Sequence, residues 1–344
     1  MDTEKKGFRA FLKRKGVEIT VKRYLIDAMG SMAMGLFASL LIGTILNTVA
    51  DKLGSAWLAE TASYATGATG PAMAVAIGFA LQAPPLVLFS LCAVGLGANT
   101  LGGPLGTLIC VIIAAELGKI VSKETKIDIL ITPTVTILSG LAVASLVGPG
   151  VSAIMNGFGA LIMNATVLNP FWMGICVSVL VGIALTLPIS SAAICAALGL
   201  VGLAGGAATA GCCAQMVGFA VMSFRENGWG GIVAQGIGTS MLQMGNIVHN
   251  PRIWIPPTLA AAITGPIATC IFGMENGVAV ASGMGTCGLV GPIGVMASEG
   301  FSGASSWVGL LLISIVLPAI LTPLIAIPFR KFGWIKDGDL KLDL

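Results

Sequence analysis

Long apolar runs with almost no charged side chains constrain this sequence more than any other feature. Charged residues make up 10% of the 344 residues and hydrophobic residues 56%, whereas a soluble domain has about 25% charged residues. A water-soluble globule is therefore excluded. The runs are also far longer than the roughly 10-residue alternating strands of a transmembrane barrel. The sequence predicts an all-α integral membrane protein.

The apolar runs predict about 8 to 10 transmembrane helices, because one crossing needs about 20 residues. The candidate segments are 25–49, 71–91, 105–121, 128–147, 151–168, 171–188, 208–224, 231–249, 253–272, 277–297 and 306–329. Several are too short to span, and Gly-rich stretches interrupt them at 95–106, 199–211 and 283–294. Irregular backbone is not tolerated against lipid, so these breaks are expected inside the protein or beside a watery cavity, as re-entrant hairpins.

Basic residues cluster at both ends of the chain. Eight Lys or Arg residues precede residue 24 and four follow residue 329, and such clusters favour the cytoplasmic side of a membrane. We therefore expect a multi-pass protein of the cell membrane with both termini cytoplasmic. The expected regions are a basic N-terminal segment (1–24), a transmembrane domain (25–330) and a cytoplasmic tail (331–344). The N-terminal segment either lies on the inner leaflet as a short helix or only fixes orientation.

Two parts of the transmembrane domain begin alike, which indicates internal repeats. Asn169-Pro170 and Asn250-Pro251 each precede an apolar run that ends at a proline and is followed by a Gly-rich segment. A looser third copy opens at Gly70-Pro71. Broken helices at matching positions of two repeats indicate a transporter site near the bilayer midplane. The alternative is that Pro and Gly are simply common in membrane helices.

Polar residues recur at helical spacing just before the second Asn-Pro pair. We call this set the amide stripe; its members are Gln235, Thr239, Gln243, Asn246, His249 and Asn250. At about 100° per residue, all but His249 fall within an arc of about 80° on one helix, and His249 lies at its edge. Such a face cannot point at lipid. Either it forms interhelical hydrogen bonds, or it lines a site for a neutral polar solute, which needs donors and acceptors together.

Residues 245–266 carry a resemblance to a known family. Their Asn-Pro, Ile-Pro and later Pro pattern (GNIVHNPRIWIPPTLAAAITGP) resembles that of the sugar-translocating enzyme IIC subunits of the bacterial phosphotransferase system. The whole apolar body, about 25 to 330, is similar to a stand-alone branch of that superfamily, described either as enzyme IIC-like proteins or as membrane regulators of toxin expression. The resemblance implies homodimers, re-entrant hairpins, and a sugar-sized site between a scaffold and a moving transport domain.

One departure from the family argues against sugar phosphorylation. Sugar-transporting relatives carry an acidic Glu-Pro motif just before the Asn-Pro stretch, whereas residues 238–243 read GTSMLQ and contain no acid. Asn169 and Glu275 complete the predicted substrate-binding set. Glu275 lies in GMENG (273–277), either in a surface turn, since Asn-Gly is a turn signal, or as a cavity carboxylate. His249 is the only histidine, and we expect it to tune affinity rather than take a proton.

No pattern in the sequence indicates an enzyme. P-loop, G-x-S-x-G and H-E-x-x-H motifs are absent. The eight cysteines lie in apolar stretches without a C-x-x-C pair, where thiols behave as small hydrophobes. We therefore predict no catalytic residue, no metal site and no cofactor.

The sequence-based hypothesis is a carrier of a small polar, carbohydrate-like solute by alternating access, without phosphorylation of that solute. The alternative is a membrane sensor or regulator that binds a solute with little flux and signals through its N-terminal segment. A channel is less favoured, because no ring of charges or filter motif is evident. The expected partners are the solute, the lipid bilayer, a second copy in a homodimer and a separate phosphotransferase or regulatory protein. Nucleic acid is not an expected partner.

Overall fold

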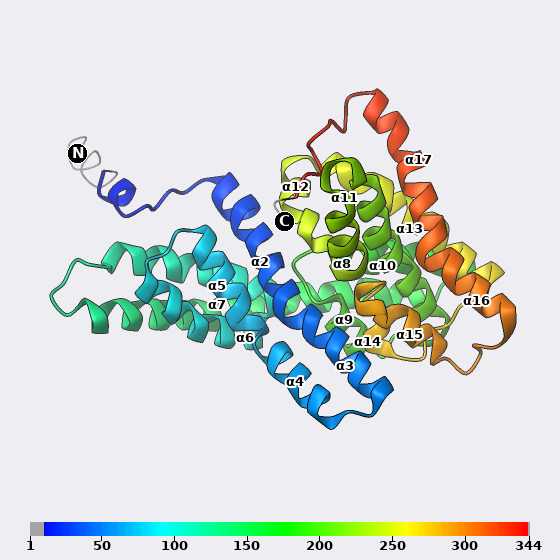
Figure 1. The fold of residues 1–344 in the computed structure, drawn as a ribbon, viewed down its shortest axis with the longest axis horizontal. Coiled ribbons are helices and arrows are strands. Elements are labelled where there is room, and N and C mark those ends of the chain that lie inside the picture. The colour runs from blue at the N-terminus through cyan, green and yellow to red at the C-terminus, as the bar shows by residue number, and fades with distance from the viewer. Residues whose placement is uncertain (1–9, 343–344) are drawn as a thin grey trace. The chain divides into compact units, whose positions relative to one another are not determined.

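The computed structural model describes residues 10–342, and the regular structure in that range is helical (Figure 1). Six of the described helices are long and apolar enough to cross a membrane: Lys22–Asn47, Pro85–Val121, Asp128–Thr166, Gly202–Met222, Pro251–Ile271 and Gly303–Lys331. Shorter apolar helices cover Thr69–Ala80, Pro170–Thr186 and Cys287–Met296. These elements confirm the prediction of an all-α membrane protein.

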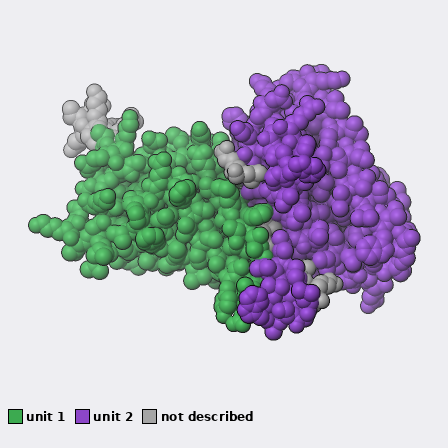
Figure 2. All heavy atoms as spheres, in the orientation of Figure 1, with its two compact units in different colours: residues 1–43, 60–153 green, residues 44–59, 154–344 purple. Residues whose placement is uncertain are grey.

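The chain divides into two compact units, which we describe separately (Figure 2). Unit 1 comprises residues 1–43 and 60–153, and unit 2 comprises residues 44–59 and 154–344. Three helices run through a division between the units: α3 (Ile42–Leu53), α4 (Ala56–Gly67) and α7 (Asp128–Thr166). The domain boundaries expected at residues 24 and 330 stay a prediction.

Unit 1 is built around a helical hairpin. Its elements before α7 are η1 (Lys22–Asp27), α2 (Ala28–Leu36), η2 (Phe37–Leu41), α5 (Thr69–Ala80) and α6 (Pro85–Val121). Within α6 the backbone leaves helical geometry at Gly103, with φ 58° and ψ −157°, and Pro104 follows. The two arms then lie side by side, since a Cβ added to Gly118 would lie 2.9 Å from Val87 Cγ1. The chain thus reverses inside the Gly-rich stretch 95–106, where the sequence predicted a break.

A buried lysine of α6 forms an ion pair within the helix and also joins the N-terminal segment to this hairpin. The Lys119 ammonium lies 2.7 Å from Glu116 Oε2 and donates to the carbonyl oxygens of Gly16 (2.8 Å) and Leu81 (3.1 Å). Only 2% of Lys119 and 9% of Glu116 is exposed. The Arg23 guanidinium also donates to the Leu81 carbonyl, at 2.7 Å. Gly16 and Arg23 are therefore anchored to unit 1, while residues 18–22 between them are exposed.

Unit 2 contains the remaining elements. In chain order they are α8 (Pro170–Thr186), α9 (Ser191–Ala197), α10 (Gly202–Met222), α11 (Phe224–Val233), η3 (Ala234–Gly238), η4 (Ser240–Gln243), α12 (Met244–His249), η5 (Pro251–Trp254), α13 (Ile255–Pro266), η6 (Ile267–Ile271), α14 (Ala279–Ser282), η7 (Cys287–Leu289), α15 (Val290–Met296), α16 (Gly303–Leu311), η8 (Leu312–Val316) and α17 (Leu317–Lys331). The helices α8, α10 and α13 pack on one another, and α17 packs on α10 and α13 (Figure 1).

Close backbone contacts hold α8 against α13. A Cβ on Gly265 of α13 would collide with the Gly174 carbonyl of α8, and one on Gly174 would lie 2.9 Å from Pro266 Cα. The Ser178 hydroxyl donates to the Ala261 carbonyl across the same contact, at 2.8 Å. Small residues therefore set the distance between these helices, as is usual in membrane bundles.

The two Asn-Pro repeats begin in the same way. The Asn169 side chain accepts from the Trp172 N–H and caps α8, and the Asn250 side chain accepts from the Arg252 N–H and caps η5. Each apolar run is then followed by broken segments and a further helix. After α8 these are extended residues and α9 before α10; after α13 they are α14, η7 and α15 before α16. The first break covers residues 187–201, earlier than the predicted 199–211, because the glycines from 202 onward belong to α10.

Candidate solute-binding site

The amide stripe does not lie on one helix, so the predicted 80° arc is wrong in its geometry. The stripe is divided among η3, η4 and α12, and Thr239 between η3 and η4 is extended, with φ −157° and ψ 142°. Gly238 ends η3, and the Thr239 hydroxyl caps η4 by accepting from the Met241 N–H at 3.2 Å. A glycine followed by a residue with a capping hydroxyl favours the end of one helix and the start of another.

The amide side chains nevertheless gather into a hydrogen-bonded chain. Gln235 Nε2 donates to Ser223 Oγ at 2.9 Å, and its Oε1 accepts from Gln243 Nε2 at 2.9 Å. Gln243 Oε1 in turn accepts from Asn246 Nδ2 at 2.8 Å. Gln235 and Gln243 are fully buried. The structure therefore brings three of the predicted residues together from three separate elements.

The C-terminal segment 333–342, which we call the docked tail, supplies the remaining acceptors. Gln243 Nε2 donates to the Leu340 carbonyl at 3.0 Å, and Asn246 Nδ2 donates to the Lys341 carbonyl at 2.9 Å. Asn227 holds the same segment from α11, donating to the Leu340 carbonyl and accepting from the Leu342 N–H, both at 2.8 Å. Gln243 and Asn246 thus each have one backbone partner about 100 residues away in sequence.

An acid of the docked tail contacts the last member of the stripe. Asn250 Nδ2 donates to Asp339 Oδ2 at 2.7 Å and to the Trp334 carbonyl at 2.9 Å. The same carboxylate oxygen of Asp339 accepts from the Lys336 N–H at 2.8 Å. The sequence argument found no acid before the Asn-Pro stretch, and the structure adds one that comes from beyond α17.

A second carboxylate lies where the docked tail leaves α17. Glu226 Oε1 accepts from the Gly338 N–H at 3.2 Å and lies 3.7 Å from the Arg330 guanidinium, which also pairs with Asp337 at 3.1 Å. Burial raises the pKa of Glu226, and the Gly338 N–H and Arg330 partly oppose that rise. The side chain of Glu226 is only 9% exposed, so its charge is held in place by the tail.

His249 is exposed at the last residue of α12. Asn169 and Glu275 lie away from the stripe. α8 has 17 residues, so its ends are about 25 Å apart. Asn169 lies at its first end, beside η6, where the Thr269 hydroxyl donates to the Pro170 carbonyl at 2.8 Å; Glu275 follows η6. The stripe meets the opposite end of α8. One solute-sized site cannot include all eight predicted residues.

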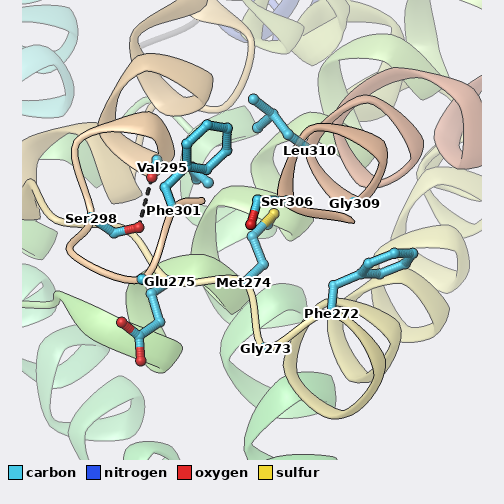
Figure 3. Close-up of a pocket in the computed structure, with 11 residues that line it drawn as sticks. Phe272, Gly273, Met274, Glu275, Val295, Ser298, Phe301, Ser306, Gly309 and Leu310 are labelled. Atoms are coloured by element: carbon cyan, nitrogen blue, oxygen red, sulfur yellow. Dashed lines mark hydrogen bonds between the residues drawn. The ribbon is translucent and has the colours of Figure 1, made fainter. Parts of the chain in front are cut away.

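Glu275 borders a small cavity of about 40 Å³ between the segment after η6 and the elements α15 and α16 (Figure 3). The side chains of Met274, Phe301 and Leu310 converge there, whereas the Glu275 carboxylate points away from them (Figure 3). Glu275 is exposed, but the next residue, Asn276, is fully buried and donates to Thr209 Oγ1 at 2.9 Å. The exposed Glu275 and Gly277 fit the surface-turn alternative, with Asn276 anchoring the turn to α10.

A second polar group, which the sequence reasoning missed, lies between the transmembrane helices of unit 2. We call it the Gln215 cluster; it contains Thr186, Gln215, Ser240, Trp254 and Thr258. Gln215 Oε1 accepts from Trp254 Nε1 at 3.1 Å, and its Nε2 donates to Thr258 Oγ1 at 3.1 Å. The Thr186 hydroxyl lies 3.4 Å from Gln215 Oε1 and 2.8 Å from Ser240 Oγ. The signal for it was the single glutamine in the 21 residues of α10.

The Gln215 cluster and the amide stripe are continuous, because Ser240 lies between Thr239 and Gln243 in the chain. Apart from His249, their side chains are amides, hydroxyls and one indole, and the Asp339 carboxylate borders the stripe at Asn250. Among residues 10–342 no group of three or more His, Cys, Asp or Glu side chains is arranged to hold a metal ion. The available chemistry is therefore hydrogen bonding to a neutral polar molecule and contact with an aromatic ring.

Helices broken at matching positions around an uncharged polar interior define a helical membrane transport protein. Residues 26–342 match the family described as phosphotransferase system, EIIC. The chain belongs to this family, whose members are the membrane translocation component of that system. Curated proteins and solved structures gave no match to the chain.

Proposed function

We propose that this protein carries a small polar, carbohydrate-like solute by alternating access and releases it unmodified. The observation that carries the proposal is the uncharged polar interior of unit 2, formed by the Gln215 cluster and the amide stripe. Their side chains offer donors and acceptors together, which suits a polyhydroxylated solute, whereas an ionic solute would be matched by charges. Trp254 adds a flat apolar face of the kind that suits a sugar ring.

The solute site in this proposal is the stripe together with the neighbouring Gln215 cluster. The amides of the stripe already have partners, but for Gln243, Asn246 and Asn250 some of these partners belong to the docked tail. Backbone carbonyls of a tail present the same acceptors that sugar hydroxyls would. A solute could therefore replace the tail without leaving buried amides unpaired, which would cost about 1–3 kcal/mol per group.

A ligand-binding measurement tests the location of the site. Purified protein is screened by thermal shift against sugars, sugar acids and nucleosides, because a ligand of the folded state raises its stability. With the solute found, Asn246→Leu is expected to abolish the shift. Asn169→Ser is the matched control, since a serine still caps α8 but removes the other predicted amide. A retained response in Asn246→Leu would refute the site.

A flux measurement tests the carrier. Proteoliposomes containing the protein are expected to exchange labelled solute across the bilayer, and Gln243→Leu is expected to stop this exchange while the purified protein remains monodisperse. Solute binding without exchange would contradict transport.

We propose that the solute is not phosphorylated, because of how the acid and the histidine near the stripe are placed and bonded. The Asp339 carboxylate is engaged by Asn250 and by the Lys336 N–H, and the exposed His249 is at the far end of α12. A base must reach the solute hydroxyl and be free to take its proton. Vesicles supplied with labelled solute and a complete phosphotransferase extract should accumulate unmodified solute. Phosphorylated product that disappears in His249→Ala or Asp339→Asn would refute this part.

We further propose a location in a bacterial cell membrane with both termini cytoplasmic, as the basic residues at the two ends suggest, and a homodimer, as the family resemblance suggests. Thr3→Cys and Asp343→Cys lie outside the described residues and provide the test. A membrane-impermeant thiol reagent added to intact cells should react with neither, and reaction at either position overturns the topology. Crosslinking and mass measurement in detergent test the dimer.

A solute-dependent regulator is the second candidate, favoured by the docked tail. A solute that takes the place of the tail would release residues 333–342, which a regulatory or phosphotransferase protein could then bind. Protease sensitivity of the tail that rises with solute, in protein that shows no flux in liposomes, would favour the regulator over the carrier.

A further inference from the structure

A basic cavity lies at the end of two packed helices of unit 2, and its lining residues Met222 and Phe224 flank Ser223, which accepts from Gln235 of the amide stripe. It has a volume of about 540 Å³ and is lined by the last residues of α10, the first of α11 and the last three turns of α17. Its wall is apolar, with Val221, Leu324 and Ile327 among the lining residues. Leu324 is 55% and Ile327 46% exposed. The wall is thus an accessible apolar surface.

Three cations lie at one end of this wall, and they differ in their partners. Arg330 is fixed: it pairs with Asp337 and Glu226 and donates to the Met222 carbonyl at 3.2 Å. Arg225 and Lys331 are exposed, and neither has a carboxylate within ion-pair distance in the described part of the chain. Two cations are therefore available to an anion from outside.

The order of groups along α17 matches that of a phospholipid. Lys331 is the last residue of the candidate span, and Phe332 and Trp334 follow, the aromatic and basic composition of a membrane interface. Ile327 and Leu324 lie four and seven residues earlier, about 6 and 10 Å deeper along the helix. The cations are at headgroup level, and the apolar wall is at the level of the acyl chains.

We propose that this cavity binds one anionic phospholipid, with its phosphate at Arg225 and Lys331 and an acyl chain along Leu324 and Ile327. Basic pockets between transmembrane helices bind anionic headgroups in this way. A small soluble anion would use the cations but would leave the apolar wall unoccupied, so the lipid is the occupant that satisfies both. The proposal is independent of the solute and of its site.

Native mass spectrometry of the full-length protein in detergent tests the site, with phosphatidylglycerol titrated against phosphatidylcholine of the same acyl chains. The wild-type protein should retain phosphatidylglycerol preferentially. The double variant Arg225→Gln/Lys331→Gln should weaken this binding by about 30-fold, as two interfacial charges predict. Lys336→Gln, which removes an exposed charge of the nearby tail outside the cavity, is the matched control and should change it little.

A second variant distinguishes the lipid from a simple anion. Leu324→Ser removes part of the exposed wall without touching a charge, and it should weaken phosphatidylglycerol binding several-fold with an unchanged melting temperature in lipid-free detergent. Equal losses in Lys336→Gln and the double variant would show diffuse surface attraction and overturn the proposal. So would full competition by millimolar inorganic phosphate together with no effect of Leu324→Ser, which would show an anion site only.

Discussion

Unit 1 buries charged side chains, whereas unit 2 buries amides. Among the described residues the buried charged side chains are Lys119 and Glu116, both in unit 1, and the buried amides are Gln215, Gln235, Gln243 and Asn276, all in unit 2. A buried charge must keep its partner, because its isolation costs several kcal/mol. An amide can exchange one neutral partner for another at little net cost. Unit 1 therefore has a polar interior suited to a fixed scaffold, and unit 2 has one that can exchange partners.

The largest expected effect comes from isolating a charge in unit 1. Lys119→Met leaves the Glu116 carboxylate buried without its cation and should lower the free energy of unfolding by about 3–5 kcal/mol. Lys126→Met, at an exposed position between α6 and α7, should be nearly neutral. Thermal unfolding in detergent measures the stability of both variants, and the rate of proteolysis within unit 1 shows whether the loss lies in that unit.

The double variant Lys119→Met/Glu116→Gln sharpens this test. Removal of both charges should recover much of the loss, because the penalty comes from the unpaired carboxylate. If the double variant is as unstable as Lys119→Met, the packing of the lysine stem matters more than the charge, and the contrast between the units fails.

A smaller effect is expected from the Gln215 cluster. Gln215→Leu leaves the Trp254 Nε1–H without its acceptor, whereas the Thr258 hydroxyl keeps its bond to the Trp254 carbonyl, so the expected cost is about 1–3 kcal/mol. Adding Trp254→Phe removes one orphaned donor, so the double variant should lose less than the sum of the single losses. If the losses of unfolding free energy in Gln215→Leu and Trp254→Phe add up to the loss in the double variant, the hydrogen bond between Gln215 and Trp254 contributes nothing to stability.

Removal of part of the docked tail should have a still smaller effect on stability. A chain that ends at Ile335 loses the acceptors from Asp339, Leu340 and Lys341, but water reaches the freed amides, so the expected cost is about 1 kcal/mol. If the stripe binds solute, the thermal shift caused by the solute should increase. Asp337→Asn is the control that leaves the tail present. If the thermal shift caused by the solute is unchanged, the stripe is not part of the solute site.

The smallest expected effect is a pH dependence of stability that arises from Glu226. Like Glu116 in unit 1, Glu226 in unit 2 is a largely buried carboxylate beside a cation. Its pKa is raised in the folded protein, so the folded state binds the proton more tightly than the unfolded chain. Stability should therefore rise as pH falls through the raised pKa, and it should level off below the ordinary carboxyl value of about 4.3. The melting temperature should rise by less than about 2 °C from pH 7.5 to pH 5 relative to Glu226→Gln. An opposite slope would mean that the Arg330 pair outweighs burial.

The fold was predictable from the sequence to a large extent, because apolar runs with so few charges can only form membrane helices. The reversal at Gly103 was also predictable, since its glycine-rich neighbourhood and the following proline favour a break. The geometry of the stripe was not, because a 100° periodicity assumes one helix and Thr239 interrupts it. The tail partners of Gln243 and Asn246 left no sequence signal, since backbone carbonyls are the same at every residue.

The glycine contacts between α8 and α13 have a consequence for how motion in this protein can be measured. With Gly174 and Gly265 seated on backbone atoms of the opposite helix, a slide of one residue would bring a larger side chain against a carbonyl. The two helices must then move as one rigid body. Spin labels or fluorophores placed one on each of them will report a constant separation through a transport cycle, which makes that pair an internal ruler against which other distances can be calibrated.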